Sequence, residues 1–502
     1  MEPDENPTKS TSRVRAFLFK NQTNKQTVAK NSFWLTVSNF GGRLVKAGVI
    51  VYGARVLGTS GWGVFSYAIT LAGFLTLFMD PGLNNIIMRE IGRSDDEKRR
   101  AIFSTTFAMK IILLLAGVAV VLFIAPHFST LAGAKELLPI VAMILGLDTL
   151  REFLTSYARG MERMEFDAAI FLLTNFGILV LGFIFLALAK TPASLAWAYV
   201  GGDILGIALA VFITRTFFKK IGHYFSSKLI VPIFQSAWPF AVTSALALLL
   251  TNTDILIISW IKTASDVGIY ASAIRIIQVL YLVPTIFQFS TLPLFARFAN
   301  KDNERFRTAL EKTIGLIFLA SFPLAIGGAI LGTGIMSFVF GAAYASGGAS
   351  FKILAIGLIF DFPAVVISSA IFAYNKQKSL IIASAIAGAI NVAFDIILIP
   401  HWGINGSSTA TLLAQIASNW YLWHIMKKIN YFSVLPSLKK IGAASVIMAI
   451  AIGALYFFHS GVIMAIIVGA LVYFGTLRLL REPLLIEIKR VLMRARAAEV
   501  TS

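Results

Sequence analysis

The chain has 502 residues, of which 57% are hydrophobic and only 14% carry a charge, and its formal net charge is +19 at pH 7. Soluble proteins carry about 25% charged residues, so a soluble globular protein is excluded. The sequence contains no cysteine, which excludes disulfides and thiol catalysis. Apolar runs of about twenty residues, the length that crosses a bilayer as a helix, recur along the whole sequence. They predict an all-α polytopic membrane protein.

The N-terminal segment 1–33 is polar and lacks the continuous apolar stretch of a secretory signal peptide, so we expect it to be a cytoplasmic tail. The apolar runs after it predict fourteen transmembrane helices. We place them near residues 34–57, 62–86, 102–125, 137–158, 168–189, 194–216, 232–260, 267–297, 306–331, 349–374, 379–400, 404–427, 439–458 and 461–480. A second, basic cytoplasmic tail follows at 481–502.

The distribution of Lys and Arg supports this count and sets its orientation. With the N-terminus in the cytoplasm, 35 of the 44 basic residues fall on cytoplasmic segments and helix ends, and 3 fall on outer loops. The positive-inside rule predicts this asymmetry, and one missed helix would invert every later loop. We therefore expect a multi-pass protein of the plasma (inner) membrane with both termini cytoplasmic. Its basic loops face membrane lipids, which explains the net charge better than binding to nucleic acid.

Two parts of the sequence resemble each other. NSFWLTVSN at 31–39 is similar to QSAWPFAVT at 235–243, and SGWGVFSYAIT at 60–70 is similar to SDVGIYASAIR at 265–275. These matches predict two pseudo-symmetric six-helix lobes, at 34–217 and 230–428, with two further helices at 439–480. Six helices per lobe keep both copies in one orientation, as in transporters that bind substrate between two halves. Chance similarity among apolar helices is the alternative.

The first predicted span contains cations where a bilayer makes them costly. Asn39, Arg43 and Lys46 fall on one stripe of a helical wheel, and Arg43 and Lys46 lie near the middle of the span. A cation at the centre of a bilayer costs roughly 2.5–3.5 kcal/mol on insertion scales, so such residues usually face a bundle interior or a water-filled pathway. Two cations on one face favour an anionic ligand, and Arg suits phosphate because its planar guanidinium donates two parallel hydrogen bonds.

Other spans contain ionisable residues too. Arg275 in the eighth span is a further candidate for a shared cationic cavity. Asp254, Asp361 and Asp395 are candidates for ion coupling or for lining the cavity. Local ion pairing that only holds helices together is the alternative for several of these groups, namely Asp148 with Arg151, and Asp203, Lys352 and Asp395.

Several stretches resemble the multidrug/oligosaccharidyl-lipid/polysaccharide (MOP) exporter superfamily, and in particular its polysaccharide-transporter branch of O-antigen-type flippases. They are DPGLNNIIMREIGR at 80–93, GIYASAIRIIQ at 268–278, LPLFARF at 292–298 and IPHWGINGSSTATLLAQ at 399–415. The resemblance covers about residues 30 to 480. It implies a flippase with a two-lobed bundle that moves polyprenyl-diphosphate-linked oligosaccharides by alternating access. In such proteins basic residues of spans 1 and 8 meet the diphosphate, which Arg43, Lys46 and Arg275 match, and spans 13 and 14 form a groove for the lipid tail.

Two alternatives remain, a multidrug/cation antiporter of the same superfamily and, in a different class, a membrane polysaccharide polymerase or ligase. The outer loops are too short for an outer catalytic site, so we expect no enzyme. The sequence lacks the phosphate-cradling motif of ATP-driven pumps, and its histidines lack metal-ligand spacing. We therefore expect no cofactor and no metal, with coupling to H⁺ or Na⁺ left open. The expected partners are a lipid-linked oligosaccharide, membrane lipids and other polysaccharide assembly proteins.

Overall fold

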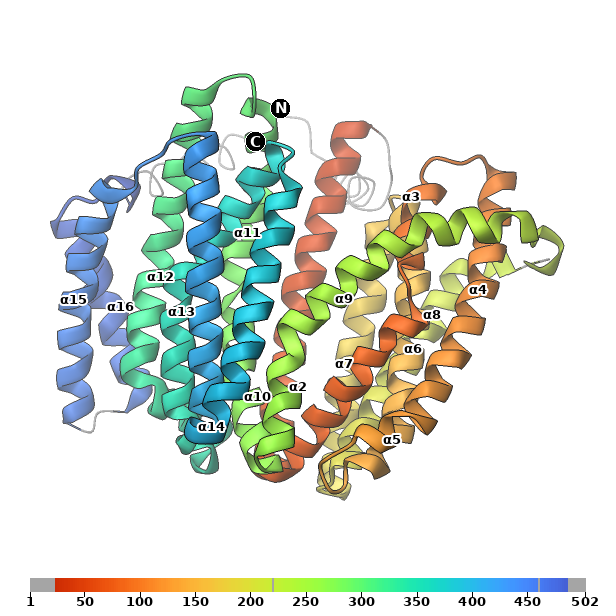
Figure 1. Ribbon diagram of the computed structural model, residues 1–502, viewed down its shortest axis with the longest axis horizontal. Helices are drawn as coiled ribbons and strands as arrows, with labels where there is room; N and C mark the ends of the chain where they lie inside the picture. The colour runs from red at the N-terminus through yellow and green to blue at the C-terminus, as the bar shows by residue number, and fades with distance from the viewer. Residues whose placement is uncertain (1–22, 219–220, 459–460, 486–502) are drawn as a thin grey trace, which may run out of the picture. The chain divides into compact units, whose positions relative to one another are not determined.

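The computed structural model describes residues 23–218, 221–458 and 461–485, and within these ranges the chain is helical and contains no strand (Figure 1). The first half forms α2 (Asn24–Met79), α3 (Leu83–Ile91), α4 (Asp96–Phe123), α5 (Ala125–Phe128), α6 (Ala134–Gly160), α7 (Met164–Leu188) and α8 (Pro192–Phe218), followed by the short 3₁₀ helices η1 (Ile221–Tyr224) and η2 (Ser227–Leu229). The second half forms α9 (Ile230–Ile261), α10 (Ala264–Leu280), α11 (Leu282–Phe298), α12 (Asn303–Phe340), η3 (Ala342–Gly347), α13 (Gly348–Ala373), α14 (Gln377–Ile429), α15 (Leu435–Phe457) and α16 (Val462–Leu479).

This architecture confirms the predicted all-α membrane fold. In the described part of the chain, nine helical segments are long and apolar enough to cross a membrane. Each of the fourteen predicted spans is helical, two of them as a pair of helices, but the number fourteen itself stays a prediction. The first helix begins at Asn24, ten residues before the predicted start of span 1. The polar residues 24–33 therefore extend the helix beyond its apolar part.

Two of the helices are long because single glycines replace the expected loops. In α2 the chain turns at Gly58 (φ 68°), between predicted spans 1 and 2. In α14 it turns at Gly403 (φ 56°), between predicted spans 11 and 12. A positive φ is strained for residues with a Cβ, and glycine adopts it freely. One residue is thus enough to reverse the direction between two spans.

Two predicted spans are interrupted, which the apolar runs do not reveal. Span 2 ends at Asp80, where the Asp80 Oδ1 accepts hydrogen bonds from the backbone N–H groups of Gly82 (3.0 Å) and Asn84 (3.4 Å) before α3 begins. Gly82 has a φ of 94°, and Pro81 restricts the conformation of the residue before it. Span 8 is divided at Tyr281, which lies between α10 and α11.

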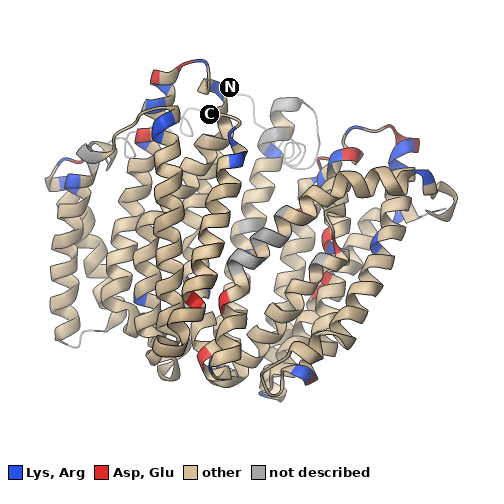
Figure 2. Ribbon diagram, in the orientation of Figure 1, with Lys and Arg blue, Asp and Glu red and all other residues tan. Residues whose placement is uncertain are grey.

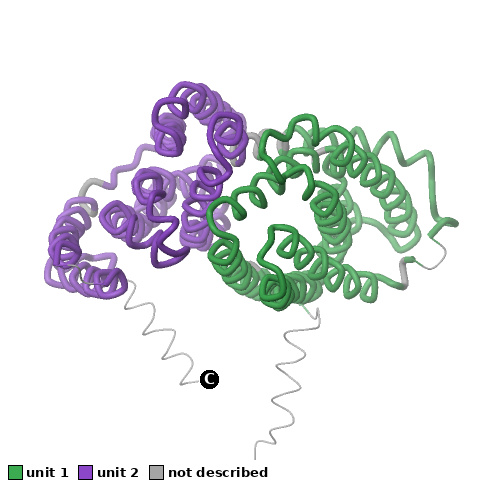
Figure 3. Tube along the Cα trace, turned by 90° about the horizontal axis from the view of Figure 1, so that it is seen from below, with its two compact units in different colours: residues 1–249 green, residues 250–502 purple. Residues whose placement is uncertain are grey.

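The chain forms two compact units, residues 1–249 and 250–502 (Figure 3). In unit 1, α7 packs on α8 and α2, and α6 packs on α3 and α8. Its core includes an aromatic cluster in which Phe103 contacts Phe153 and Tyr157. In unit 2, α13 packs against α12 and α14, and α15 and α16 pack together and onto α12. The division between the units falls within α9, whose first part packs on Leu83 and Met109 through Ile233 and Ala237.

Candidate functional site

The predicted cationic stripe lies on the first part of α2. The side chains of Arg43 and Lys46 are exposed and, being three residues apart, share one face of the helix. Arg43 precedes the turn at Gly58 by fifteen residues, or about 22 Å at 1.5 Å per residue, so it lies well inside a hydrocarbon core of about 30 Å. The side chain of Asn39 is outside the described part of the structure.

Other charged groups of unit 1 are paired within the bundle. Arg151 on α6 contacts Asp148 on the same helix, and its Nε lies 3.6 Å from the Asp203 Oδ1 on α8. Lys46 also interacts electrostatically with Asp203. These contacts agree with the local-pairing alternative for Asp148 and Asp203. A charged layer therefore connects α2, α6 and α8, and Lys46 is its member on the exposed face of α2.

A second buried ion pair closes the break after α2. The Nζ of Lys110 on α4 lies 3.3 Å from the Asp80 Oδ2, and the lysine side chain is fully buried. The same carboxylate accepts the two backbone hydrogen bonds at the break. Lys110 thus neutralises a carboxylate that shapes the backbone, which is a structural role.

Unit 2 brings together two of the three acidic candidates, Asp254 on α9 and Asp395 on α14. Both side chains are buried, and their carboxyl groups lie beside each other. The hydroxyl groups of Tyr270 and Thr411 donate to the Asp254 Oδ2, the latter at 3.1 Å. Asn391 donates to the Thr411 Oγ1 at 3.3 Å. We call these five residues the α9–α14 acidic cluster.

This cluster contains acceptor oxygens without donors. Both carboxyl oxygens of Asp395 and the Oδ1 of Asp254 have no hydrogen-bond partner of normal geometry among the described residues. Buried carboxylates are normally paired or bind a metal, because an uncompensated charge in a low dielectric is costly. Two adjacent carboxylates can both stay ionised there only if a cation lies between them, and otherwise the pair shares a proton. The arrangement is therefore suited to binding a small cation.

The third acidic candidate, Asp361 on α13, is satisfied by its neighbours. The Tyr281 hydroxyl donates to its Oδ2, and Asn419 Nδ2 donates to its Oδ1 at 2.7 Å. Tyr281 is the residue at which span 8 is divided, so this contact ties the break between α10 and α11 to α13. Asp361 is thus separate from the α9–α14 acidic cluster, and its geometry favours a bracing role.

The remaining two cationic candidates also lie in unit 2. Arg275 on α10 is half-buried and donates from Nη1 to the Gln278 Oε1 at 2.8 Å. The side-chain stem of Lys352 on α13 packs against Gly332 of α12. A shared site of Arg275 with Arg43 and Lys46 stays a prediction.

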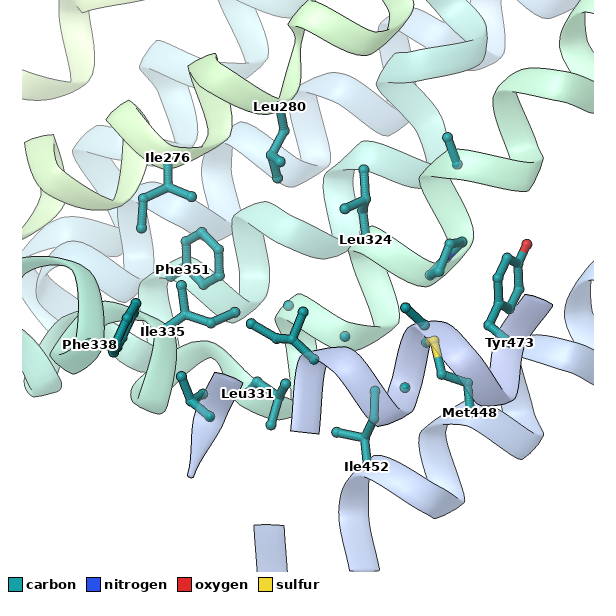
Figure 4. Close-up of a pocket in the computed structure, with 18 of the residues that line it drawn as sticks. Ile276, Leu280, Leu324, Leu331, Ile335, Phe338, Phe351, Met448, Ile452 and Tyr473 are labelled. Atoms are coloured by element: carbon teal, nitrogen blue, oxygen red, sulfur yellow. The ribbon is translucent and has the colours of Figure 1, made fainter. Parts of the chain in front are cut away.

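Unit 2 also contains a large apolar cavity of about 600 Å³ between α12, α15 and α16, with walls from α10 and α13 (Figure 4). Its lining is aliphatic and aromatic and includes Leu324, Leu331, Met448 and Ile452. Tyr473 also lines the cavity, but its hydroxyl group is already engaged, because it donates to the Leu319 carbonyl at 2.9 Å. The resemblance implied an apolar groove on residues 439–480, and the cavity draws more of its wall from α12 than from those two helices.

The comparisons with known proteins agree with this fold. The family model described as "Polysaccharide biosynthesis protein" matches residues 28–299, more than half of the chain. The chain belongs to this family, within the MOP superfamily. A second family model of the superfamily, MatE, matches residues 239–397. This member of the polysaccharide biosynthesis family is a membrane transporter, as the resemblance predicted.

Several relatives of this family member carry names. A protein of Shigella flexneri named "Putative O-antigen transporter" is 23% identical over 70% of this chain and 86% of its own length. A protein of Haloferax volcanii named "Probable low-salt glycan biosynthesis flippase Agl15" is 24% identical over 86% of this chain and 90% of its own length. These names describe transporters and not enzymes.

Solved structures show the same fold. "Lipid II flippase MurJ, inward closed conformation" matches with a TM-score of 0.74 at 20% identity, over 90% of this chain and 99% of that one. A multidrug resistance MATE family transporter of the MOP superfamily, in an inward-facing conformation, matches with a TM-score of 0.64 at 15% identity, over 80% of this chain and 98% of that one. At these identities the likeness shows the fold alone.

Proposed function

We propose that the protein is a flippase that moves a polyprenyl-diphosphate-linked oligosaccharide, the repeat unit of a polysaccharide or O-antigen, from the inner to the outer leaflet. The observation that carries this proposal is the exposed pair Arg43 and Lys46, deep within a span of a protein of the polysaccharide biosynthesis family. The names of the relatives, which include an O-antigen transporter and a glycan flippase, support it.

The charged part of such a substrate requires cations that the bilayer does not supply. Arg43 presents a planar guanidinium that donates two hydrogen bonds to a phosphate, and Lys46 adds a second positive charge on the same face. Arg275 is the third cation of the proposed central cavity, and alternating access exposes that cavity to each leaflet in turn. The interaction of Lys46 with Asp203 keeps its charge compensated when no phosphate is bound.

The apolar part of the substrate requires an apolar surface that stays within the membrane. The cavity between α12, α15 and α16 supplies it, because its lining offers nearly no polar group to a hydrocarbon chain. We assign the polyprenyl tail to this cavity and the diphosphate to the α2 cations.

The α9–α14 acidic cluster binds the coupling ion of the proposed cycle. Two carboxylates, the Thr411 hydroxyl and the Asn391 amide offer oxygen ligands of the kind that alkali cations take, and a proton shared by the two carboxylates is the alternative occupant. Binding there stabilises one conformation of unit 2 and so links ion entry to substrate exit.

An export assay tests the proposal. In cells that lack their own flippase, we measure the lipid-linked glycan at the surface and the amount of each variant in the membrane fraction. The double variant Arg43→Gln, Lys46→Gln should insert normally and fail to export, since it keeps the helix but lacks the phosphate ligands. Arg43→Lys should be partly active, because an ammonium group lacks the bidentate fork.

The matched control is Arg55→Gln, which removes a cation of the same helix three residues before the turn at Gly58. It should export at the wild-type rate. Normal export by the double variant would refute the cationic site.

The match of residues 239–397 to the MatE model supports a second candidate, a multidrug/cation antiporter. Drug efflux that the double variant retains, with no glycan export by the wild type, would favour that function. Cationic drugs do not need Arg43 and Lys46.

A further inference from the structure

A basic pocket in unit 2 lies apart from all of the groups used above. It has a volume of about 520 Å³ and lies where three helix ends meet, after α11, after α13 and at the end of α14. Figure 2 shows that Lys and Arg gather at such helix ends, whereas the helix interiors carry few. The lining includes three exposed lysines, Lys301, Lys376 and Lys428, and none of its described residues is acidic.

The floor of this pocket is ordered by hydrogen bonds. The Tyr374 hydroxyl donates to the Asn303 Oδ1 at 3.2 Å and accepts from the Asn430 Nδ2, also at 3.2 Å. Asn430 donates to the Asn303 carbonyl at 2.9 Å as well. Beneath this layer the rings of Phe306 and Tyr374 lie 4.7 Å apart. These hydrogen bonds hold the polar floor of the pocket in place, and the three lysines lie around it.

Backbone dipoles add to the positive potential. Helix α14 begins at Gln377 without a side-chain cap, so its first N–H groups and the positive end of its dipole lie beside Lys376. The turn before α12 contains Asn300 (φ 60°) and the turn before α14 contains Asn375 (φ 57°), and both residues are in the left-handed region. Two acids flank the lining residue Asn303: Asp302 caps α12 and pairs with Arg305 at 3.3 Å, and Glu304 is exposed in the first turn of α12.

The depth of the pocket in the membrane points to the source of the anion. Tyr431, two residues beyond the lining residue Ile429 at the end of α14, is 65% exposed. Exposed Tyr and Trp mark the membrane interface, where lipid headgroups lie. Basic pockets between membrane helices at this level attract anionic headgroups.

We propose that this pocket binds a phosphate group carried by the headgroup of an anionic phospholipid. The phosphate accepts hydrogen bonds from Lys301, Lys376 and Lys428, while the acyl chains stay in the bilayer beside α14. The shared chemistry is that of a phosphate ester, and a soluble phosphate compound is the other source that the experiment separates. The proposal does not depend on what the protein transports.

The test is a titration of the detergent-solubilised full chain with phosphatidylglycerol, followed by thermal unfolding, with phosphatidylcholine as the reference lipid. The triple variant Lys301→Gln, Lys376→Gln, Lys428→Gln should shift the phosphatidylglycerol midpoint by about fivefold per lysine, or roughly a hundredfold in all. Added salt should weaken binding to the wild type, since the lysines are exposed.

The matched control removes three exposed cations of unit 2 that do not line the pocket, through Arg307→Gln, Lys439→Gln and Arg478→Gln. It should keep the wild-type midpoint. If the pocket variant does not fold, the triple Lys→Arg variant of the same positions provides the test, because it keeps the charges and should keep binding.

Three results would overturn the proposal. Phosphatidylglycerol that stabilises the wild type no more than phosphatidylcholine would leave no anionic site. An equal loss in both triple variants would mean that overall charge attracts the lipid. Equal stabilisation of the wild type by soluble glycerol phosphate at the same concentration would assign the pocket to a free phosphate compound.

Discussion

Replacement of Asp395 by Asn separates an ion site from a structural carboxylate. Asp395 is 0% exposed, and neither of its carboxyl oxygens has a hydrogen-bond partner of normal geometry among the described residues. Asn has nearly the same shape but no charge, so the variant removes one of two adjacent carboxylates and leaves the packing of α14 unchanged. We expect Asp395→Asn to fold, and to lose its response to the coupling cation.

The magnitude follows from mass action. A ligand that binds only the folded state at 100 times its dissociation constant stabilises that state by about 2.7 kcal/mol. Wild-type protein should gain that amount in saturating Na⁺, and Asp395→Asn should gain nothing. Without Na⁺ the wild type should lose this gain, because one of the two buried carboxyl groups then takes up a proton instead of pairing with the cation.

The assay is thermal unfolding in sodium chloride and in choline chloride at equal ionic strength. Asp361→Asn is the matched control, since Asp361 already accepts hydrogen bonds from Tyr281 and Asn419. It should lower stability equally in both salts. A sodium response that persists in Asp395→Asn would place the cation elsewhere. A wild type that unfolds identically in both salts at every pH would refute the reasoning, whereas a response to pH alone would identify the shared proton.

Three further predictions concern topology, packing and the apolar cavity. In this cysteine-free chain, Glu97→Cys at the exposed start of α4 should resist an impermeant thiol reagent added outside intact cells and react once the membrane is opened; labelling from outside would invert the proposed orientation. Lys110→Met should destabilise the protein by about 2–3 kcal/mol, as measured by denaturation in detergent. Breaking a fully buried ion pair costs about 3–5 kcal/mol, and the loss here is smaller because 20% of the Asp80 side chain is exposed. Gly327→Leu should lower export without loss of protein, because a Cβ at Gly327 meets open space in the cavity, which the leucine side chain then fills. The control Gly453→Leu is equally unhindered but lies outside the cavity lining, so it should export normally. Equal export by both variants would argue against a lipid-tail site.

The membrane fold could be predicted from the sequence because each span is a local property of its own apolar run. The interruptions at Asp80–Gly82 and Tyr281 could not, since hydropathy averaged over a span does not respond to a single break. The DPG triplet was a usable signal, because Pro after Asp and before Gly favours a turn. Gly403 also makes a turn, without any loop, between predicted spans 11 and 12.

The candidate site divides in a similar way. Arg43 and Lys46 were recognisable because cations are rare in apolar helices, but the contact of Arg151 with Asp203 joins two helices that the sequence does not align. The pairing of Asp254 with Asp395 is also tertiary, since it joins α9 to α14. One signal was overlooked: Asn391 and Asp395 are four residues apart in an apolar span, and so share a helix face.

Charged groups within the spans differ in sign between the two units, and this asymmetry bears on the direction of transport. In unit 1 the buried cations Lys110 and Arg151 have acidic partners, and Arg43 and Lys46 present two positive charges on the exposed face of α2 within the span. In unit 2 the unsatisfied carboxyl oxygens of Asp254 and Asp395 give its interior a negative excess. An anionic substrate leaving the cell and a cation entering it both move down a membrane potential that is negative inside. Each elementary charge that crosses gains about 2.3 kcal/mol per 100 mV. Under the proposed function, one potential therefore drives both halves of the cycle in the direction of export.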